Sequence, residues 1–475
     1  MFKILIVIAA FFTSGVLLVH KFYAENDHIA YSSFKLNADP AANYKNYCSS
    51  CHGELMEAFV DRKWKYGSDK KSLIHAINIG YPNDGMPGFD TAFTDKEAEE
   101  LADYILEGLK NVQRFDFSKQ EKQQTTYSGD GMNIQLETVI GGLKYPWGLA
   151  FLPNDDILFT EKTGQLYRYA KPNKLNRISG VPEVVAEGQG GLMDIILHPD
   201  FKKNKTIFLS YSKPKEEGGK TLATTAIMSA VLENDELTQQ KIIFEAYPYS
   251  QTRHHYGSRM VFGNDGMLYF SVGDRGNHNQ NPQDLQYDPG KIHRIKDDGT
   301  VPTDNPFVNT ANARKTIYSY GHRNPQGLVK HPETGEIWSH EHGPRGGDEI
   351  NLVQKGKNYG WPVISYGINY NGTTFTDKTA MPGMEQPLLY WIPSIGPSGM
   401  TIVSSNKYKK WKGDILTGSL RFKYLNLSSL DGHKVKDKAI LFENIGRLRD
   451  VKMGNDGYIY ISVENPGTIY RLQPK

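Results

Sequence analysis

Short apolar strands separated by polar turns recur along the chain from residue 135 to its C-terminus. Six segments repeat a polar turn followed by an alternating apolar strand: "NDDILFTEKTGQLYRY" from Asn154, "KNKTIFLSYS" from Lys203, "NDGMLYFSVGD" from Asn264, "TGEIWSHEHG" from Thr334, "GDILTGSLRF" from Gly413 and "NDGYIYISVENPGTIYRL" from Asn455. Another short apolar strand precedes each segment. Repeats made only of strands and turns predict radially arranged four-stranded sheets. The sequence therefore predicts an all-β, six-bladed β-propeller over residues 135–475, because a β-sandwich does not require a sixfold recurrence.

The N-terminal part shows a helical pattern. The segment "TDKEAEELADYILEGLKNV" opens with Thr94, and Glu97 follows three residues later, as in a capping box. Its apolar positions recur at helical spacing, at Ala98, Leu101, Tyr104, Ile105 and Leu109. We expect a small all-α domain over residues 35–113. Residues 114–134 are rich in Gln, Lys and Ser without apolar periodicity, which predicts a linker.

The extreme N-terminus has the pattern of an export segment. Lys3 precedes an uncharged, mostly apolar run over residues 4–19, as in a secretory signal. Ala24 suits a processing site, whereas the bulky Phe22 does not, and the run is shorter than the ~18 residues usually needed to cross a bilayer. Residues 1–24 are therefore interpreted as either a cleaved signal peptide or a retained membrane anchor. Both interpretations place the protein in the periplasm or cell envelope.

Composition narrows the range of partners. The chain has 475 residues, a formal net charge of +2 and a sequence pI near 8.1. A charge this close to balance gives no reason to expect nucleic acid or an acidic membrane surface as a partner. At this length a second folded unit beside the propeller is expected.

Both cysteines of the chain lie in "NYCSSCHGE", at Cys48 and Cys51, and His52 directly follows the second. A disulfide or a redox dithiol would not need the histidine, whereas C-x-x-C-H is the spacing of covalent haem attachment, with the imidazole on the iron. We expect Met86 in "NDGMPGF" to be the second axial ligand, because Met56 lies very close to the attachment site. With its closing helix, this segment resembles class I cytochrome c domains, which implies a bound haem c.

The residues just before the first strand of each repeat carry most of the polar chemistry. These stretches are "PWG" from Pro146, "GQGG" from Gly188, "HHYGS" from His254, "GHRNPQG" from Gly321, "SIGPSG" from Ser394 and "GRLRD" from Gly446. Equivalent positions of propeller blades form a ring around the axis, so these side chains are expected to meet at one mouth of the channel. Converging guanidinium groups suit a ligand that bears carboxylates.

Arg447 and Arg449 are the strongest candidates for carboxylate binding. Residues two apart in an extended strand share a face, so both guanidinium groups are expected to point to the same place. Arg253 and Arg259, taken one at a time, are more simply explained as solvated loop arginines. The stretch that contains the two adjacent histidines is expected to be extended, so that their side chains point to opposite sides, only one faces the mouth, and they do not share a metal ion.

Three motifs together resemble one enzyme family. They are "YGHRNPQGL" (320–328), "EHGPRGGDEINL" (341–352) and "KGKNYGWP" (355–362), and they are similar to motifs of the pyrroloquinoline-quinone (PQQ)-dependent aldose sugar dehydrogenases and soluble glucose dehydrogenases. The resemblance covers residues 135–475. It implies that His255 is the general base. His254 stands where the glucose dehydrogenases have an aspartate, so the group that orients the base is expected to differ.

The same resemblance implies positions for the cofactors. It gives this set of quinone-binding residues: Gln189, Arg323, Asn324, Arg421, Arg447 and Arg449. Of these, Arg421 replaces a lysine of the family, which keeps the charge but changes the geometry. The backbone carbonyls of Gly343 and Pro344 are implied to hold the Ca²⁺ beside the quinone. Glu349 and Tyr359 stand where aldose sugar dehydrogenases can hold a second Ca²⁺.

The function that this resemblance implies is oxidation of the anomeric hydroxyl of an aldose to a lactone, with PQQ and Ca²⁺ as cofactors. The attached haem c would take up the electrons and pass them to a downstream respiratory acceptor. Other alcohols, or sugar aldehydes such as sorbosone, are alternative substrates. A metal-dependent propeller lactonase or hydrolase has no use for the haem, and a non-catalytic binding propeller does not need the converging arginine and histidine side chains.

Overall fold

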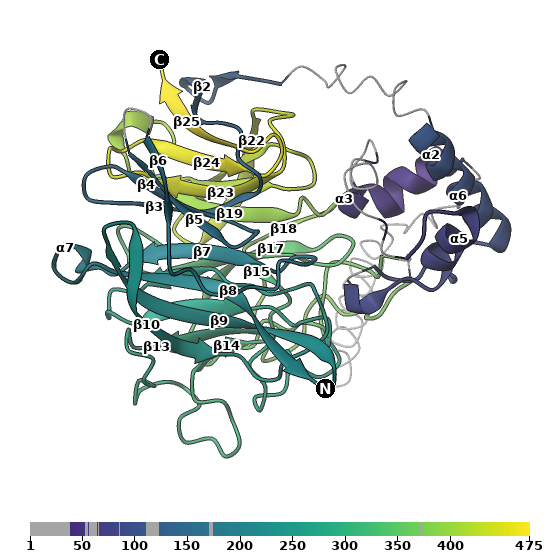
Figure 1. Ribbon diagram of the computed structural model, residues 1–475, viewed down its shortest axis with the longest axis horizontal. Coiled ribbons are helices and arrows are strands. Elements are labelled where there is room, and N and C mark those ends of the chain that lie inside the picture. Colours follow the sequence, from purple (N-terminus) through teal and green to yellow (C-terminus); the bar gives the residue numbers. More distant parts are fainter. Residues whose placement is uncertain are drawn as a thin grey trace, which may run out of the picture. The chain divides into compact units, whose positions relative to one another are not determined.

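The computed structural model describes residues 39–52, 56, 64, 66–84, 86–110, 123–170, 174–370 and 373–475. The chain forms two compact units, one helical and one built from strands (Figure 1). The predicted export segment and most of the predicted linker lie outside the described residues. Among the described residues, no helix is long and apolar enough to cross a membrane.

The helical unit contains short helices and one longer closing helix. They are α2 (Pro40–Asn43), the π-helical turn η1 (Tyr44–Cys48), α3 (Ser49–His52), α5 (Lys70–Asn78), the 3₁₀ turn η2 (Pro82–Asp84) and α6 (Asp95–Lys110). The capping box is present, because the Thr94 amide donates to a Glu97 carboxylate oxygen at 2.9 Å and the Glu97 amide donates to Thr94 Oγ1 at 3.3 Å. One face of α6 is buried at Ala98, Leu101, Ala102 and Ile105. The structure thus contains the closing helix that the apolar periodicity predicted.

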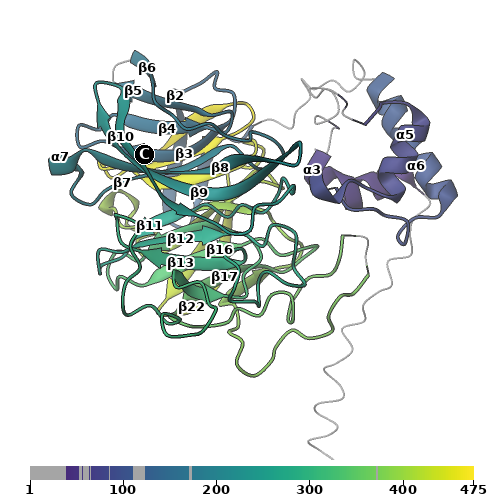
Figure 2. The same ribbon diagram turned by 60° about the horizontal axis from the view of Figure 1, so that its bottom comes forward.

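The larger unit is a ring of six antiparallel sheets (Figure 1 and Figure 2). The first sheet contains β3 (Pro146–Phe151), β4 (Ile157–Glu161), β5 (Gln165–Ala170) and β6 (Lys174–Ile178), and the second contains β7 (Leu192–Leu197), β8 (Thr206–Glu217), β9 (Lys220–Glu233) and β10 (Glu236–Glu245). The third sheet contains β11 (Met260–Phe262), β12 (Leu268–Val272), β13 (Lys291–Ile295) and β14 (Ile317–Tyr320), and the fourth contains β15 (Pro325–Lys330), β16 (Ile337–Glu341), β17 (Asp348–Val353) and β18 (Leu389–Trp391). The fifth sheet contains β19 (Pro397–Ile402), β20 (Ile415–Ser419), β21 (Leu425–Asp431) and β22 (Lys434–Leu441). Two short helical turns, α7 (Phe201–Asn204) and η4 (Asn406–Tyr408), interrupt the connections. The predicted six-bladed β-propeller is confirmed.

The sixth sheet closes the ring with strands from both ends of the propeller sequence. It contains β23 (Leu448–Met453), β24 (Ile459–Val463), β25 (Thr468–Pro474), β2 (Met132–Ile140) and β1 (Thr126–Gly129). Strand β2 pairs antiparallel with β25, from Ile134 opposite Pro474 to Ile140 opposite Ile469. This pairing replaces an exposed sheet edge by a continuous blade.

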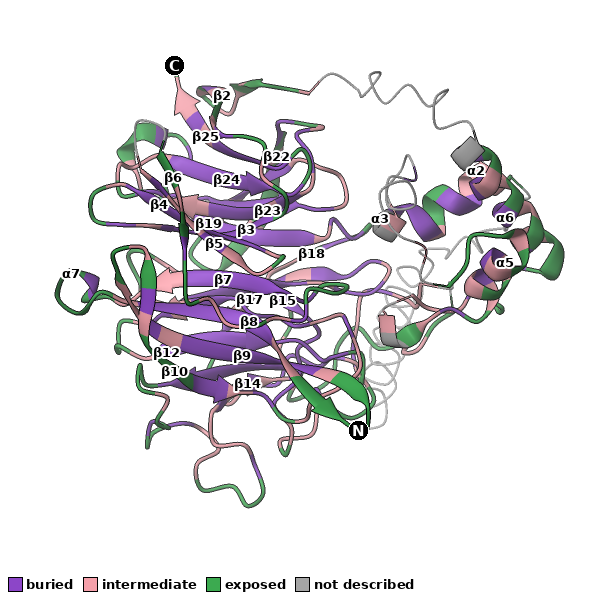
Figure 3. Ribbon diagram, viewed as in Figure 1, coloured by how far each residue is buried: buried purple, intermediate pink, exposed green. Residues whose placement is uncertain are grey.

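The second strand of most blades is buried at every position. This holds for β4, β12, β16, β20 and β24, and the inner strands appear as continuous buried ribbons in Figure 3. Both faces of each sheet are covered by a neighbouring blade, so the two-residue alternation of a one-sided sheet is lost there. The innermost strands β3, β7, β11, β15, β19 and β23 contact one another in sequence, and β23 contacts β3. The stretches that precede these strands therefore surround one axis.

Candidate active site

His255 lies just before β11, on a sharply turned backbone. Its φ is +54°, and Gly257 and Ser258 also have positive φ, at +64° and +87°. The prediction of an extended stretch is wrong here, because three of the four residues from 255 to 258 have positive φ. The rings of His254 and His255 do not point apart. They meet edge to face with their centroids 4.5 Å apart.

Asp274 orients the His255 ring. Its Oδ1 lies 2.7 Å from His255 Nδ1, and the carboxylate is 1% exposed. Asp274 Oδ2 accepts the indole N–H of Trp361 at 2.9 Å. A carboxylate only accepts, so Nδ1 carries the proton and Nε2 is left as the proton acceptor. The residue that orients the base thus lies two residues after the end of β12, not beside the base in the sequence.

The surroundings keep both histidines neutral. Burial and then the charge of Arg323 lower the pKa of His255, although Asp274 opposes this shift. Burial and then the neighbouring His255 lower the pKa of His254 to about 2. Burial alone would raise the pKa of Asp274, but the charge and hydrogen bond of His255 lower it. A neutral imidazole beside an ionised carboxylate is the arrangement of a general base.

Two hydrogen bonds hold Gln189 beside the histidine loop. The His255 amide donates to Gln189 Oε1 at 2.8 Å, and the Gln189 amide donates to the Arg253 carbonyl at 2.7 Å. Arg253 Nε in turn binds Glu187 at 2.9 Å. Arg253 is only 7% exposed, so its interpretation as a solvated loop arginine is wrong. It joins the loops that precede β7 and β11 and so places Gln189 next to the base.

Arg323 and Asn324 lie before β15, beside the same histidine loop. The Arg323 carbonyl accepts the Asp274 amide at 2.7 Å, and its guanidinium lies over the Trp361 ring at 5.3 Å. Asn324 Oδ1 accepts the Gly257 amide at 3.1 Å. Asn324 Nδ2 is buried and has no hydrogen-bond partner among the described residues. That amide is therefore a donor available to a ligand, as expected of a quinone-binding residue.

Arg447 and Arg449 converge on one carboxylate, that of Glu464. Arg447 Nε lies 3.2 Å and Arg449 Nε 2.8 Å from its two oxygens. Burial would raise the pKa of Glu464, but Arg449 and Arg447 lower it to about 2. The two guanidinium groups thus meet at one place, and their geometry suits carboxylates. Glu464 was not predicted, although it directly follows β24 in "ISVENPG".

The segment with the predicted calcium-binding carbonyls is tightly packed. A Cβ on Gly343 would lie 2.2 Å from the Gly347 carbonyl oxygen, so only glycine fits. Asp348 accepts the Gly343 amide and the Gly396 amide, each at 2.8 Å, and burial raises the pKa of Asp348 to about 6. The Gly343 carbonyl accepts from Arg323 at 2.6 Å, and the Pro344 carbonyl accepts from Ser394 Oγ at 3.1 Å. Both carbonyls keep a second lone pair, and hard oxygen donors of this kind suit Ca²⁺.

Ser394 also links Arg421 to this segment. Arg421 Nη1 donates to the Ser394 carbonyl at 3.2 Å, and the guanidinium lies over the Phe422 ring at 4.8 Å. The residue that replaces the lysine of the family is thereby placed beside the residue that binds Pro344.

Glu349 and Tyr359 line a cavity of about 10 Å³ together with Glu341. Asn351 Nδ2 bridges the two carboxylates, at 3.2 Å from Glu341 and 3.3 Å from Glu349. Burial and the nearby charge of Glu341 raise the pKa of Glu349 well above its ordinary value. The Tyr359 hydroxyl binds the Leu352 carbonyl and accepts the Gln354 amide. One buried and one half-buried carboxylate, with an amide between them, are a donor set that a hard cation would stabilise.

Cys48, Cys51 and His52, three of the predicted haem residues, lie on adjoining helical turns. Cys48 is the last residue of η1 and is buried, while Cys51 and His52 lie on α3. The Cys51 side chain is outside the described part of the structure. Met86 forms a β-bridge with Tyr81, whose amide donates to the Met86 carbonyl at 2.7 Å. The separation of one helical turn between the cysteines suits two thioether bonds to one porphyrin.

The family model for Glucose / Sorbosone dehydrogenase matches residues 143–471. The chain belongs to this family. Similar curated proteins include sugar dehydrogenases, and the chain is an oxidoreductase of this family. A second model, Cytochrome C oxidase, cbb3-type, subunit III, matches residues 36–105. The predicted cytochrome c domain is thereby confirmed, and the matching model is of the cbb3 type.

Proteins and solved structures similar to this chain cover its propeller. The aldose sugar dehydrogenase YliI of Escherichia coli (strain K12) is 41% identical over 352 residues, which cover 72% of this chain and 93% of that protein. The apo-form crystal structure of the soluble aldose sugar dehydrogenase from Escherichia coli has a TM-score of 0.69, 38% identity, and coverage of 72% of this chain and 100% of that one. The PQQ-bound aldose sugar dehydrogenase from Streptomyces coelicolor has a TM-score of 0.61 and 26% identity, and covers 74% of this chain and 100% of that one.

Proposed function

We propose that this protein oxidises the anomeric hydroxyl of aldose sugars to lactones with PQQ and Ca²⁺, and passes the electrons to its own haem c. The observation that carries the proposal is the His255 imidazole, neutral and fixed by Asp274 at 2.7 Å, next to the Arg323 and Asn324 loop. A base, an oriented ring and nearby cationic and amide donors are what the chemistry needs from the protein.

The proton is handled by the chain itself. His255 Nε2 takes the proton of the anomeric hydroxyl, while Asp274 stabilises the positive charge that then forms on the ring. Gln189 Oε1 accepts the His255 backbone amide. The side-chain N–H₂ group of Gln189 would then contact sugar oxygens. When bound, PQQ supplies the acceptor for the hydride that leaves the anomeric carbon, and Ca²⁺ supplies Lewis acidity.

The residues that would hold these groups come from four blades. Arg447 and Arg449 would bind quinone carboxylates in competition with Glu464. Arg323, Asn324 and Arg421 would contact the quinone, and the Gly343 and Pro344 carbonyls would bind the Ca²⁺. Support for this fit comes from the unpartnered Asn324 amide and from the two converging guanidinium groups. Glu349 and Tyr359 would hold a second Ca²⁺.

The haem gives the electrons a second carrier on the same chain. Cys48 and Cys51 would bind the porphyrin, and His52 and Met86 the iron. Covalent connection raises the effective concentration of an acceptor above what diffusion would give. We expect the electrons to continue to a respiratory acceptor in the cell envelope. An alcohol or a sugar aldehyde of the sorbosone type would use the same base, and a substrate panel distinguishes these substrates.

Reconstitution tests the function directly. We expect the full-length apoprotein, carrying its haem, to show sugar-dependent haem reduction only after PQQ and Ca²⁺ are added, measured by the haem absorbance. Chelation of Ca²⁺ before the addition of PQQ should prevent the reduction. Haem reduction without PQQ, or none with it, would refute the mechanism. Hydrolysis of a lactone without any haem reduction would favour the alternative hydrolase.

The haem residues make a separate prediction. In the variant Cys48→Ser with Cys51→Ser, covalent haem should be absent and haem reduction lost, while sugar oxidation with an added dye continues. The measurement is a pyridine haemochrome spectrum beside a dye-linked assay. Met86→Leu should retain covalent haem but lose the thioether–iron spectrum, whereas Met56→Leu should keep both. A normal spectrum in Met86→Leu would exclude Met86 as the axial ligand.

A further inference from the structure

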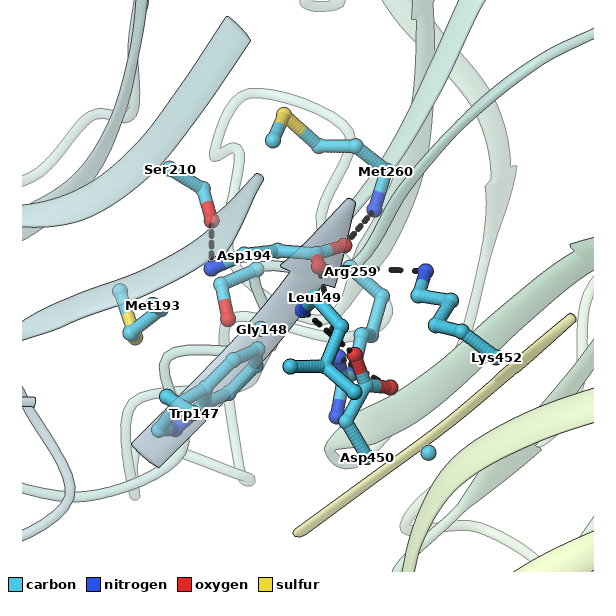
Figure 4. Close-up of polar contacts among 12 residues, drawn as sticks. Trp147, Gly148, Leu149, Met193, Asp194, Ser210, Arg259, Met260, Asp450 and Lys452 are labelled. Atoms are coloured by element: carbon cyan, nitrogen blue, oxygen red, sulfur yellow. Dashed lines mark hydrogen bonds and ion pairs between the residues drawn. The ribbon is translucent and has the colours of Figure 1, made fainter. Parts of the chain in front are cut away.

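Arg259 contacts residues of several inner strands around the axis of the propeller. Arg259 immediately precedes β11 and is only 1% exposed, so its interpretation as a solvated loop arginine is wrong. Its guanidinium lies 4.0 Å from the centroid of the Trp147 ring, on the first blade. Figure 4 shows it among side chains of several inner strands. A long buried cation of this kind requires partners for each of its donors.

Those partners come from three other blades. Arg259 Nη1 lies 2.9 Å from Asp450 Oδ1 and 3.4 Å from Asp194 Oδ1. Its Nε donates to the Gln326 carbonyl at 2.8 Å, and its Nη2 donates to the Arg449 carbonyl at 2.6 Å. The guanidinium thus holds the starts of β7, β15 and β23 at fixed positions around the axis.

The two carboxylates are themselves anchored to the innermost strands. Asp194 accepts the Met260 amide at 3.0 Å, and Asp450 accepts the Leu149 amide at 3.0 Å (Figure 4). Both aspartates are at most 1% exposed. Burial raises the pKa of Asp450, and Arg259 opposes that shift. Without the Arg259 charge, Lys452, whose Nζ lies 4.0 Å from Asp194 Oδ1, would be the cation left beside the two buried carboxylates among the described residues, and one negative charge would lose its partner, which is unfavourable.

The contacts of Arg259 converge on Arg449. Arg259 binds the Arg449 carbonyl, and Ser398 Oγ donates to the same carbonyl at 2.8 Å. The Arg449 side chain returns to the same neighbours, since its Nη1 lies 3.2 Å from Ser398 Oγ and 3.3 Å from Gln326 Oε1. Both guanidinium groups also lie over the Trp147 ring, that of Arg449 at 5.5 Å. Arg259 therefore holds the Arg449 backbone and the Gln326 backbone, and Gln326 in turn contacts the Arg449 guanidinium.

We propose that Arg259 is a positioning residue for Arg449, and that through Arg449 it determines how tightly the protein binds the carboxylates of its quinone. This inference rests on the proposed function, because it assumes that Arg449 binds the cofactor. In this proposal Arg259 has no contact of its own with the cofactor. Its five guanidinium N–H groups in a planar fork allow it to reach carbonyls and carboxylates on three blades at once, which a lysine ammonium with three donors at one point does not do.

The test is the affinity of the full-length apoprotein for PQQ in the presence of Ca²⁺, measured by tryptophan fluorescence titration. Arg259→Lys keeps the charge between Asp194 and Asp450 but loses the fork, so the Kd for PQQ should rise at least ~10-fold, about 1.4 kcal/mol. Arg294→Lys is the matched control. Arg294 is also buried, with ion pairs to Asp265 and Asp304, and its replacement should lower thermal stability without changing the Kd.

A double-mutant cycle separates positioning from a general loss of stability. In an Arg449→Met background, Arg259→Lys should leave the Kd for PQQ nearly unchanged, since the group that it positions is gone. An equal rise of Kd in both backgrounds, or a wild-type Kd in Arg259→Lys alone, would overturn the inference. Failure of the wild-type protein to bind PQQ would refute the proposed function instead.

A charge-neutral variant covers the case in which Arg259→Lys does not fold. In Arg259→Gln with Asp450→Asn, the cation and one carboxylate are removed together, so no new net charge is buried. The same rise of Kd is expected, and it should again disappear in the Arg449→Met background. A wild-type Kd in this double variant would overturn the inference.

Discussion

Replacement of His255 by alanine is expected to lower kcat for aldose oxidation by at least ~100-fold, the usual contribution of a general base. The loss follows from the geometry, because His255 Nε2 is the acceptor left when Asp274 holds Nδ1 at 2.7 Å. Haem content and PQQ affinity should remain close to those of the wild type. Steady-state kinetics with a dye acceptor, together with a haem spectrum, measure all three quantities.

His433→Ala is the control for this variant. His433 is an exposed histidine that also pairs with a carboxylate, Glu336, at 2.9 Å, and its loss should leave kcat unchanged. Near-normal turnover in His255→Ala would show that the base is elsewhere. His254 would then be the next residue to replace, since its ring touches that of His255.

Asp274→Asn is expected to lower kcat by roughly 100- to 10,000-fold, as in other histidine–carboxylate pairs. An asparagine amide does not require a proton on His255 Nδ1, so the ring is free to take the wrong tautomer. It also removes the negative charge that stabilises the protonated ring. Asp437→Asn is a matched control, because Asp437 likewise accepts a tryptophan indole N–H, from Trp391 at 2.7 Å, and should leave kcat unchanged.

The same variant predicts a direction for the pH dependence. Burial and Arg323 lower the pKa of His255, so the neutral base persists below pH 6.5 and the acid limb of kcat/KM is expected below that value. Asp274 opposes this lowering. Its neutralisation in Asp274→Asn should therefore move the acid limb to still lower pH while the plateau falls. A shift of the limb to higher pH, or an unchanged plateau, would contradict the role of Asp274.

The blades were predictable from sequence because each repeat contains a recognisable polar turn and alternating apolar strands. The ring of pre-strand stretches followed from the symmetry of a propeller, and it correctly placed the loops of Gln189, His255 and Asn324 next to one another. The convergence of Arg447 and Arg449 was likewise legible from their spacing. Local periodicity and rotational symmetry together therefore carried most of the architecture.

The acidic partners were missed, although the sequence contains a signal for them. Four repeats place an acidic residue at or just after the end of the second strand, at Glu161, Asp274, Glu341 and Glu464. The second strand runs antiparallel to the first, so its end lies at the same end of the blade as the pre-strand stretch; Glu341 pairs opposite Pro325 in this way. Reading both strands of each repeat would have brought carboxylates to the base and to the arginines.

Other features could not be read from the sequence. The positive φ at His255 depends on how its loop packs, and the residue types around His255 do not predict a positive φ at that position. The burial of Arg259 needs Asp194 and Asp450, which lie on other blades and become neighbours only when the ring is closed. Such contacts depend on the relative rotation of the blades, which no single repeat encodes.

The closing pair of strands sets an order for biosynthesis. Strand β2 is made first among the propeller strands apart from β1, yet its partner β25 ends only at Pro474, next to the C-terminus. The last blade, which carries Arg447, Arg449 and Glu464, therefore has to wait for nearly the whole chain. Contacts so distant in sequence form late and slowly. The N-terminal cytochrome domain has all of its residues before that point, so its cysteines would be available for the proposed haem attachment before the proposed quinone site has formed.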